Sequence, residues 1–141
     1  MKAWLSKAAV QMREQIDDSF ADRSRKSDGW IGNEKHQNTK SDHNPLPKTF
    51  EVCAIDVDAK LCDQPEMSIY LAEQIRVAAK TDKRISYIIH VGKIASPLLG
   101  WKWRKYRGIN SHHKHIHISF KANQKGDFFN IPLLGGNNET I

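Results

Sequence analysis

The sequence predicts an α+β domain in which two helices accompany a small set of strands. Apolar residues recur at steps of three and four over 3–20 and again over 65–80, as on the buried face of an amphipathic helix. Residues 50–58, 85–91 and 115–120 are instead β-prone or alternate between polar and apolar side chains, as half-buried strands do.

The composition fits a single domain over residues 1–141, because a chain of this length can bury one core but not two. No apolar run approaches the roughly 20 residues of a membrane-spanning helix, and residues 1–7 have no signal-peptide cleavage site. We therefore expect a protein that stays in the cytoplasm of the producing cell unless something else releases it. Cys53 and Cys62 are then expected to be reduced thiols. The net charge of +6 favours an anionic partner, either nucleic acid or a component of the cell envelope.

The two helices are predicted from their apolar stripes. The first stripe consists of Trp4, Leu5, Ala8, Ala9, Met12 and Ile16. Charges of both signs lie opposite it, which favours packing on the core over binding to a membrane surface. The second helix is expected to begin at Pro65, with Asp63 as its N-cap, and to end near Lys80.

Residues 22–48 have no periodicity and form a long predicted loop. Loops of this length are usually disordered or functional. The polar side chains in it favour a functional loop that lines an active site: Arg25, Ser27, Asp28, His36, Ser41, Asp42 and His43.

The strand over 50–58 ends on two carboxylates, Asp56 and Asp58, which share one face. Such a pair can remain solvated or can offer oxygen ligands at the rim of a sheet. The strand over 85–91 contains His90, which we interpret as structural or as the wall of a pocket, and a second short strand is expected at 94–95.

Residues 101–108 place three aromatic side chains among four basic ones. This pattern suits stacking on bases or sugars, and it equally suits a loop that buried tryptophans anchor. The C-terminal tail, 121–141, is expected to wrap around the core through its apolar residues.

The strand over 115–120 reads His-Ile-His-Ile-Ser-Phe, so its histidines and Ser119 face one side and its apolar residues face the core. Two histidines two residues apart can be a simple surface pair, or they can belong to a metal site. Together with His43 and Asp56 they could supply two imidazoles and a carboxylate, a common ligand set for catalytic zinc. An imidazole that is not a ligand could then transfer protons.

Three short motifs carry a family resemblance: Ser41-Asp42-His43, Ala54-Ile55-Asp56 and His115-Ile116-His117. The pattern resembles the zinc superfamily of D-Ala-D-Ala carboxypeptidases, L-alanyl-D-glutamate endopeptidases and hedgehog-type domains, and most closely the small peptidases of phages and prophages. It covers residues from about 4 to 120. The resemblance implies a small antiparallel sheet that carries a zinc site and is flanked by helices.

The resemblance also implies roles for single residues. His43, Asp56 and His117 would be the ligands of one Zn²⁺ per chain, and His115 the general base or transition-state stabiliser. His112 would be a further catalytic group that either supports the ligands or contacts the substrate. Arg25, Ser41 and Trp103 would contact the substrate, with Arg25 binding a carboxylate.

Two features depart from the family pattern. Thirteen positions separate His43 from Asp56 where relatives have seven, and the Glu of the Glu-x-x-His relatives is replaced by Lys114 or His112. If His115 rather than His117 were the ligand, His112 would take the place of the base.

The expected function is therefore a monomeric zinc peptidase that hydrolyses the peptidoglycan stem peptide, as a phage or prophage endolysin does. The basic charge and the His43-Asn44 pair leave a metal-dependent nuclease as an alternative, although nucleic acid is not the expected partner. A zinc-binding module without catalysis is a third possibility.

Overall fold

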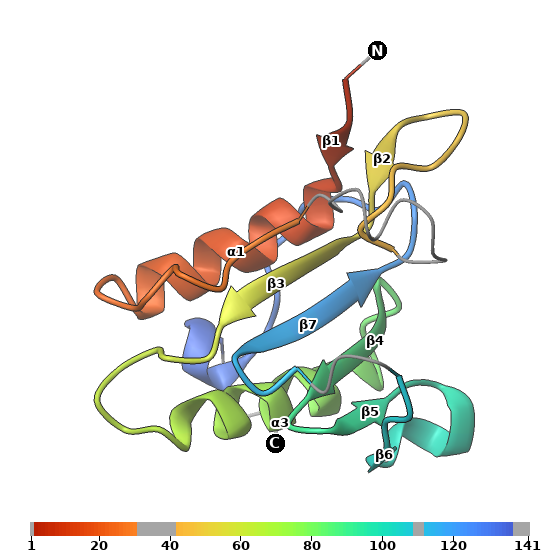
Figure 1. Cartoon of the computed structure of the whole chain (residues 1–141). Coiled ribbons are helices and arrows are strands. Elements are labelled where there is room, and N and C mark those ends of the chain that lie inside the picture. Colours follow the sequence, from red (N-terminus) through yellow and green to blue (C-terminus); the bar gives the residue numbers. More distant parts are fainter. Residues whose placement is uncertain (1, 31–41, 109–111, 137–141) are drawn as a thin grey trace.

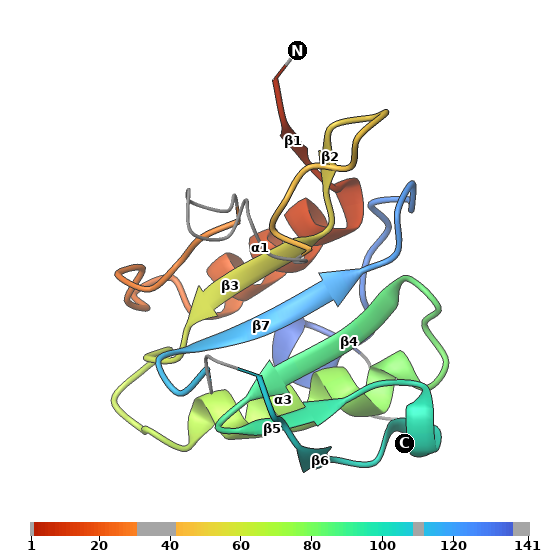
Figure 2. The same ribbon diagram turned by 45° about the vertical axis from the view of Figure 1, so that its right-hand side comes forward.

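The computed structural model describes residues 2–30, 42–108 and 112–136 and shows an α+β fold (Figure 1). Its main sheet is antiparallel, and Figure 2 shows the strands in the order β3-β7-β4-β5-β6. The strands are β3 (Ala54–Asp58), β7 (His115–Phe120), β4 (Ile85–His90), β5 (Lys93–Ala95) and β6 (Arg104–Lys105). The expected coarse fold class is confirmed.

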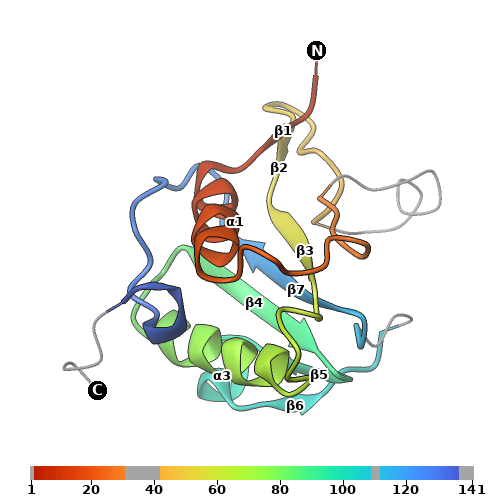
Figure 3. The ribbon, with the colours of Figure 1, turned by 90° about the vertical axis from the view of Figure 1, so that its left-hand side faces the viewer.

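Two α-helices of the described chain, α1 (Lys7–Ser19) and α3 (Met67–Ala79), cover one face of this sheet (Figure 3). The core between the layers contains Met12 and Ile16 from α1, Leu71 and Ile75 from α3, and Ile55, Val57, Ile88, Ile116 and Ile118 from the sheet. Each such side chain contributes roughly 1.5–3 kcal/mol when it is fully buried. Within the described ranges, no helix is both long and apolar enough to cross a membrane.

The predicted alternation in β7 is confirmed. Ile116, Ile118 and Phe120 lie in the core, while His117 faces the side of the sheet without helices and lies opposite Asp56 of β3. The antiparallel register therefore brings a carboxylate and an imidazole together without any contribution from the loops.

The first helix is shorter than predicted. Trp4–Leu5 is not helical but forms a strand, β1, that pairs in parallel with β2 (Glu51–Val52). The backbone N–H of Trp4 donates to Phe50 (3.1 Å) and that of Ser6 donates to Val52 (2.9 Å), so the chain is held extended until the helix begins. The predicted strand over 50–58 is correspondingly divided at Cys53 into β2 and β3.

The start of α3 also differs from the prediction. The helix begins at Met67 with Glu66 as its N-cap and has no side-chain capping bond, so the assignment of Asp63 as the cap was wrong. Pro65 lies in the turn before the helix.

The tail packs on the core as expected and includes the short 3-10 helix η2 (Pro132–Leu134). Phe129, Ile131 and Leu134 are buried, and the Gln15 side chain donates to the carbonyls of Phe129 (2.9 Å) and Leu134 (3.1 Å).

Candidate metal centre

Three residues far apart in the sequence meet on the face of the sheet without helices. His43 comes from the segment before β2, Asp56 from β3 and His117 from β7. His43 Nε2 lies 3.2 Å from His117 Nδ1 and 3.2 Å from Asp56 Oδ2, and His117 Nδ1 lies 3.1 Å from Asp56 Oδ1. We call these three residues the ligand triad.

The outer nitrogen of each imidazole has its own partner. His43 Nδ1 lies 3.0 Å from the carbonyl oxygen of Trp30, which can only accept, so Nδ1 donates and Nε2 presents a lone pair to the triad. His117 Nε2 lies 2.7 Å from Ser119 Oγ, and in the tautomer that donates to Ser119 its Nδ1 is also free to bind a cation. Partners of this kind fix the ring orientation of metal-binding histidines.

The spacing of the triad fits tetrahedral zinc. With bonds of about 2.0–2.1 Å, two ligands of a tetrahedral zinc ion lie roughly 3.3 Å apart. The three separations in the triad are 3.1–3.2 Å. Two imidazole lone pairs at this distance repel each other unless a proton or a cation lies between them, so the donor set matches a bound cation.

Two further histidines approach the same carboxylate. His115 Nε2 lies 3.5 Å from Asp56 Oδ2, is buried, and has no hydrogen-bond partner in the described part of the chain. The His112 ring packs edge-on against those of His115 (centroids 4.9 Å apart) and His117 (5.2 Å). Asp56, His112 and His115 form a second group that could hold a metal ion. The triad and this second group share Asp56.

The charges at the site shift several pKa values. Burial alone would raise the pKa of Asp56, but hydrogen bonds with His117 and His43 and their charges hold it well below its usual range. Burial alone would lower the pKa of His43, yet the hydrogen bond and charge of Asp56 raise it. The pKa of His115 is lowered by burial and by the neighbouring His117 and His43.

Residues 23–29 of the predicted loop, which we call the strap, hold β3 in place through hydrogen bonds. Gly29 and Asp56 exchange backbone hydrogen bonds of 2.7 and 3.1 Å beside the edge strand. The fully buried Arg23 guanidinium donates two hydrogen bonds, of 2.8 and 2.7 Å, to the Asp28 carboxylate. Asp28 Oδ1 also accepts a hydrogen bond from the backbone N–H of Asp58 (2.7 Å). The strap therefore fixes the backbone on both sides of the Asp56 side chain. The sequence interpretation missed Arg23, and no local pattern in this aperiodic loop indicates its pairing with Asp28.

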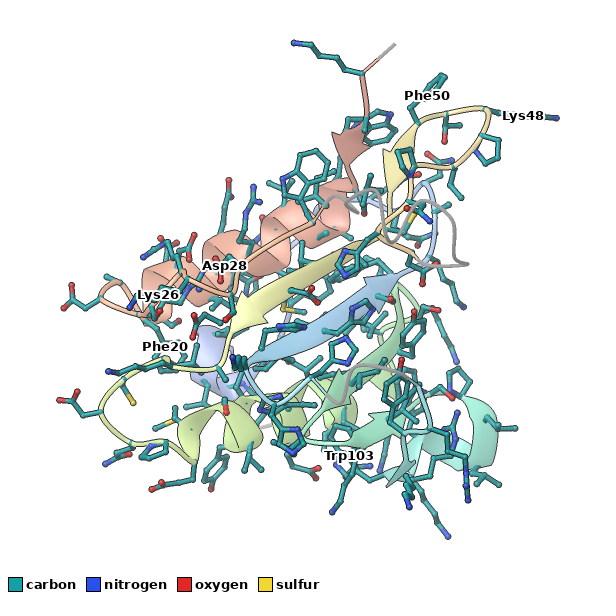
Figure 4. All side chains as sticks on the ribbon, viewed as in Figure 1. Phe20, Lys26, Asp28, Lys48, Phe50 and Trp103 are labelled. Atoms are coloured by element: carbon teal, nitrogen blue, oxygen red, sulfur yellow. The ribbon has the colours of Figure 1, made fainter. Side chains whose placement is uncertain are left out.

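The two predicted substrate-binding residues that the structure describes, Arg25 and Trp103, have their polar contacts with residues outside the triad. The Arg25 guanidinium lies 3.3 Å from Asp17 of α1 and donates to the Arg23 carbonyl (3.2 Å). The Trp103 indole N–H donates to Glu73 of α3 (2.7 Å), and Figure 4 shows Trp103 beside α3 and β5. Ser41 and His36 lie outside the described residues.

Tyr87 is a neighbour of the triad that sequence reasoning did not single out. Its ring stacks on that of His117, with centroids 5.4 Å apart and planes at 16°. Burial raises the pKa of Tyr87, so the hydroxyl stays protonated at neutral pH. Its position opposite Ser119 in the β4–β7 register, on the face of His117, is the signal that could have identified it.

Compared with family models, curated proteins and solved structures, the chain matches none of them. The chemistry of the site therefore follows from its own donor atoms. Three of them converge on one point, and a fourth, His115 Nε2, lies beside that point.

Proposed function

We propose that the protein is a zinc-dependent peptidase that hydrolyses amide bonds in the stem peptide of peptidoglycan. The convergence of His43, Asp56 and His117 at 3.1–3.2 Å carries the proposal, because this ligand set leaves a fourth position open on a tetrahedral ion. Bound zinc would supply Lewis acidity for the scissile carbonyl and lower the pKa of a coordinated water from about 15.7 to about 7.

His115 is the group best placed to move the proton. Its Nε2 lies 3.5 Å from Asp56 Oδ2 of the triad and forms no hydrogen bond with another described residue. It can accept a proton during attack on the carbonyl and return it to the leaving amine. His112, which packs on His115, keeps that ring in place.

The choice of peptidoglycan rests on the resemblance of the three motifs to cell-wall peptidases and on the charge of +6, which suits an anionic wall. Phage or prophage lysis is the setting in which such a small peptidase is expected. The aromatic-basic stretch over 101–108 gives no support to a nuclease. Trp101 is buried in the core, and the Trp103 indole is hydrogen-bonded to Glu73 of α3.

Arg25 stays a proposed substrate ligand. Half of its side chain is exposed (49%), and its ion pair with Asp17 at 3.3 Å is weak enough to exchange for a substrate carboxylate.

The test is an assay of purified protein on muropeptides and on plasmid DNA, with and without a chelator. We expect about one zinc per chain, release of peptide fragments, loss of that activity with chelator and its return with zinc. Peptide release that survives complete removal of metal, or cleavage of DNA alone, would refute the proposal. A His113→Ala variant is the matched control, because His113 is exposed and belongs to neither group of possible ligands.

A further inference from the structure

His90 lies at the end of β4, is only 1% exposed, and forms hydrogen bonds through both ring nitrogens. Its Nδ1 is 2.9 Å from the carbonyl oxygen of His112 and 3.0 Å from that of His115. Both carbonyls can only accept, so Nδ1 carries the proton and is shared between them. Nε2 must then accept from the hydroxyl of the buried Ser68 on α3, at 3.0 Å.

The backbone that His90 holds is strained. His112 has φ 59°, in the left-handed region that non-glycine residues avoid. Its carbonyl receives a second hydrogen bond from the backbone N–H of Val91 (3.2 Å), and Val91 itself has φ 45°. His90, the last residue of β4, and Val91, which follows it, therefore both bind one carbonyl in an otherwise unfavourable turn.

The turn determines where two site imidazoles stand. His112 and His115 bracket it, and their rings meet edge-on at 4.9 Å beside Asp56. His90 acts from the helix-covered side of the sheet, and its hydrogen bonds go to the backbone that carries the two rings.

We propose that His90, whose Nδ1 donates to the two backbone carbonyls and whose ring is oriented by Ser68, is a positioning residue that sets the place of the His112 and His115 side chains at the metal centre. The proposal rests on the proposed function for its kinetic consequence only; its structural part stands on the hydrogen bonds.

Two substitutions of His90 distinguish a role in positioning the backbone of the turn from a role in filling the core. Asn places its amide nitrogen two bonds beyond Cβ, where His has Nδ1, so His90→Asn keeps a donor for the two carbonyls. Gln places its amide nitrogen three bonds beyond Cβ, where His has Nε2, so His90→Gln keeps a partner for Ser68 and loses that donor. Both remove the ring, so a role in packing alone would affect both alike.

The experiment compares the two variants and the unmodified protein by zinc content, amide hydrogen exchange and steady-state kinetics on muropeptides. For His90→Gln we expect unchanged zinc, faster exchange of the Val91 amide, and a kcat that falls roughly 10- to 100-fold at nearly constant KM, as for partners of metal-site residues. His90→Asn should retain Val91 protection and most of kcat.

Equal losses in the two variants, or loss of zinc together with kcat in His90→Gln, would overturn the proposal. If His90→Gln fails to fold, Ser68→Ala decides. It removes the hydrogen bond that orients the His90 ring, so Val91 exchange and kcat should shift in the same direction by a smaller factor, and no shift refutes the proposal. If the unmodified protein has no peptidase activity, the proposed function fails, but the exchange of Val91 still tests the role of His90.

Discussion

Asp56 and His117 stand directly opposite each other on β3 and β7, with Asp56 Oδ1 3.1 Å from His117 Nδ1. Removal of His117 should therefore empty the site. His117→Ala takes away one of three protein ligands, so we expect zinc to be lost and the melting temperature to fall toward that of the metal-free protein. Elemental analysis and thermal unfolding with and without chelator measure both effects. His113→Ala should behave like the unmodified protein, and a His117→Ala protein that still binds one zinc would contradict the assignment.

His115→Ala should fail in a different way. The triad remains complete, so the variant should keep its zinc and most of its thermal stability. Without the proton-transfer group, its rate should fall by roughly 10²- to 10⁴-fold. Zinc content and kcat are measured on the same preparation. If His115→Ala loses zinc and His117→Ala retains it, His115 is the ligand, and His112 is then either the base or a further ligand in the group with Asp56 and His115.

The two arginines of the loop should differ in what they support. Arg23→Met leaves Asp28 partly buried without its two charged hydrogen bonds, so the free energy of unfolding should fall by about 3 kcal/mol. Arg25→Ala removes an exposed ion pair and should change stability by less than about 1 kcal/mol. Denaturant titration measures both.

The same Arg25→Ala variant tests the substrate contact. Loss of a bidentate partner for a carboxylate should lower kcat/KM while zinc content stays the same. Activity on peptidoglycan that is indifferent to the change would show that Arg25 does not contact the substrate.

The ionised Asp58 side chain should raise the free energy of unfolding near neutral pH, and this contribution should be lost in acid. Burial alone would raise its pKa, but hydrogen bonds from the backbone of Lys60 and Ser27 and from the Ser24 hydroxyl lower it. A carboxylate whose folded pKa lies below its unfolded value of about 3.9 stabilises the fold above that value, and the contribution is lost as pH falls through the folded pKa.

Asp58→Asn turns an amide N–H₂ toward these donors, so it should destabilise the protein by about 1–3 kcal/mol at pH 7. Urea titrations at pH 7 and at pH 3 are the comparison, and the difference between the two proteins should shrink at the lower pH. A difference that does not change with pH would mean that the carboxylate charge is not responsible.

The parts of the site that could be predicted follow from local periodicity and from spacing. The two-residue period of β7 placed Ile116 and Ile118 in the core and His117 on the opposite face, and the donor types of the three motifs predicted that His43 and Asp56 would join it. What the local pattern could not show depends on partners distant in the sequence. Trp4–Leu5 continues the apolar stripe of the helix, and only its pairing with Glu51–Val52 makes it a strand.

Arg23 was missed, and His90 was predicted only as a structural residue or a pocket wall, for a related reason. A buried arginine or histidine looks like any other polar residue until its partners are known, and those partners are Asp28 on one side and Ser68 with two backbone carbonyls on the other. The three-dimensional arrangement, not the residue type, gives each its role.

The sharing of Asp56 by both groups of possible ligands sets a limit on metal loading. Two divalent ions held by one carboxylate would repel each other at a separation of a few ångströms, so filling one group weakens the other. A second ion would also occupy His115, the side chain that we propose to carry protons. If the protein is the zinc peptidase proposed above, the dependence of its activity on zinc concentration should therefore rise to a maximum near one equivalent and then decline, because excess metal would inhibit it.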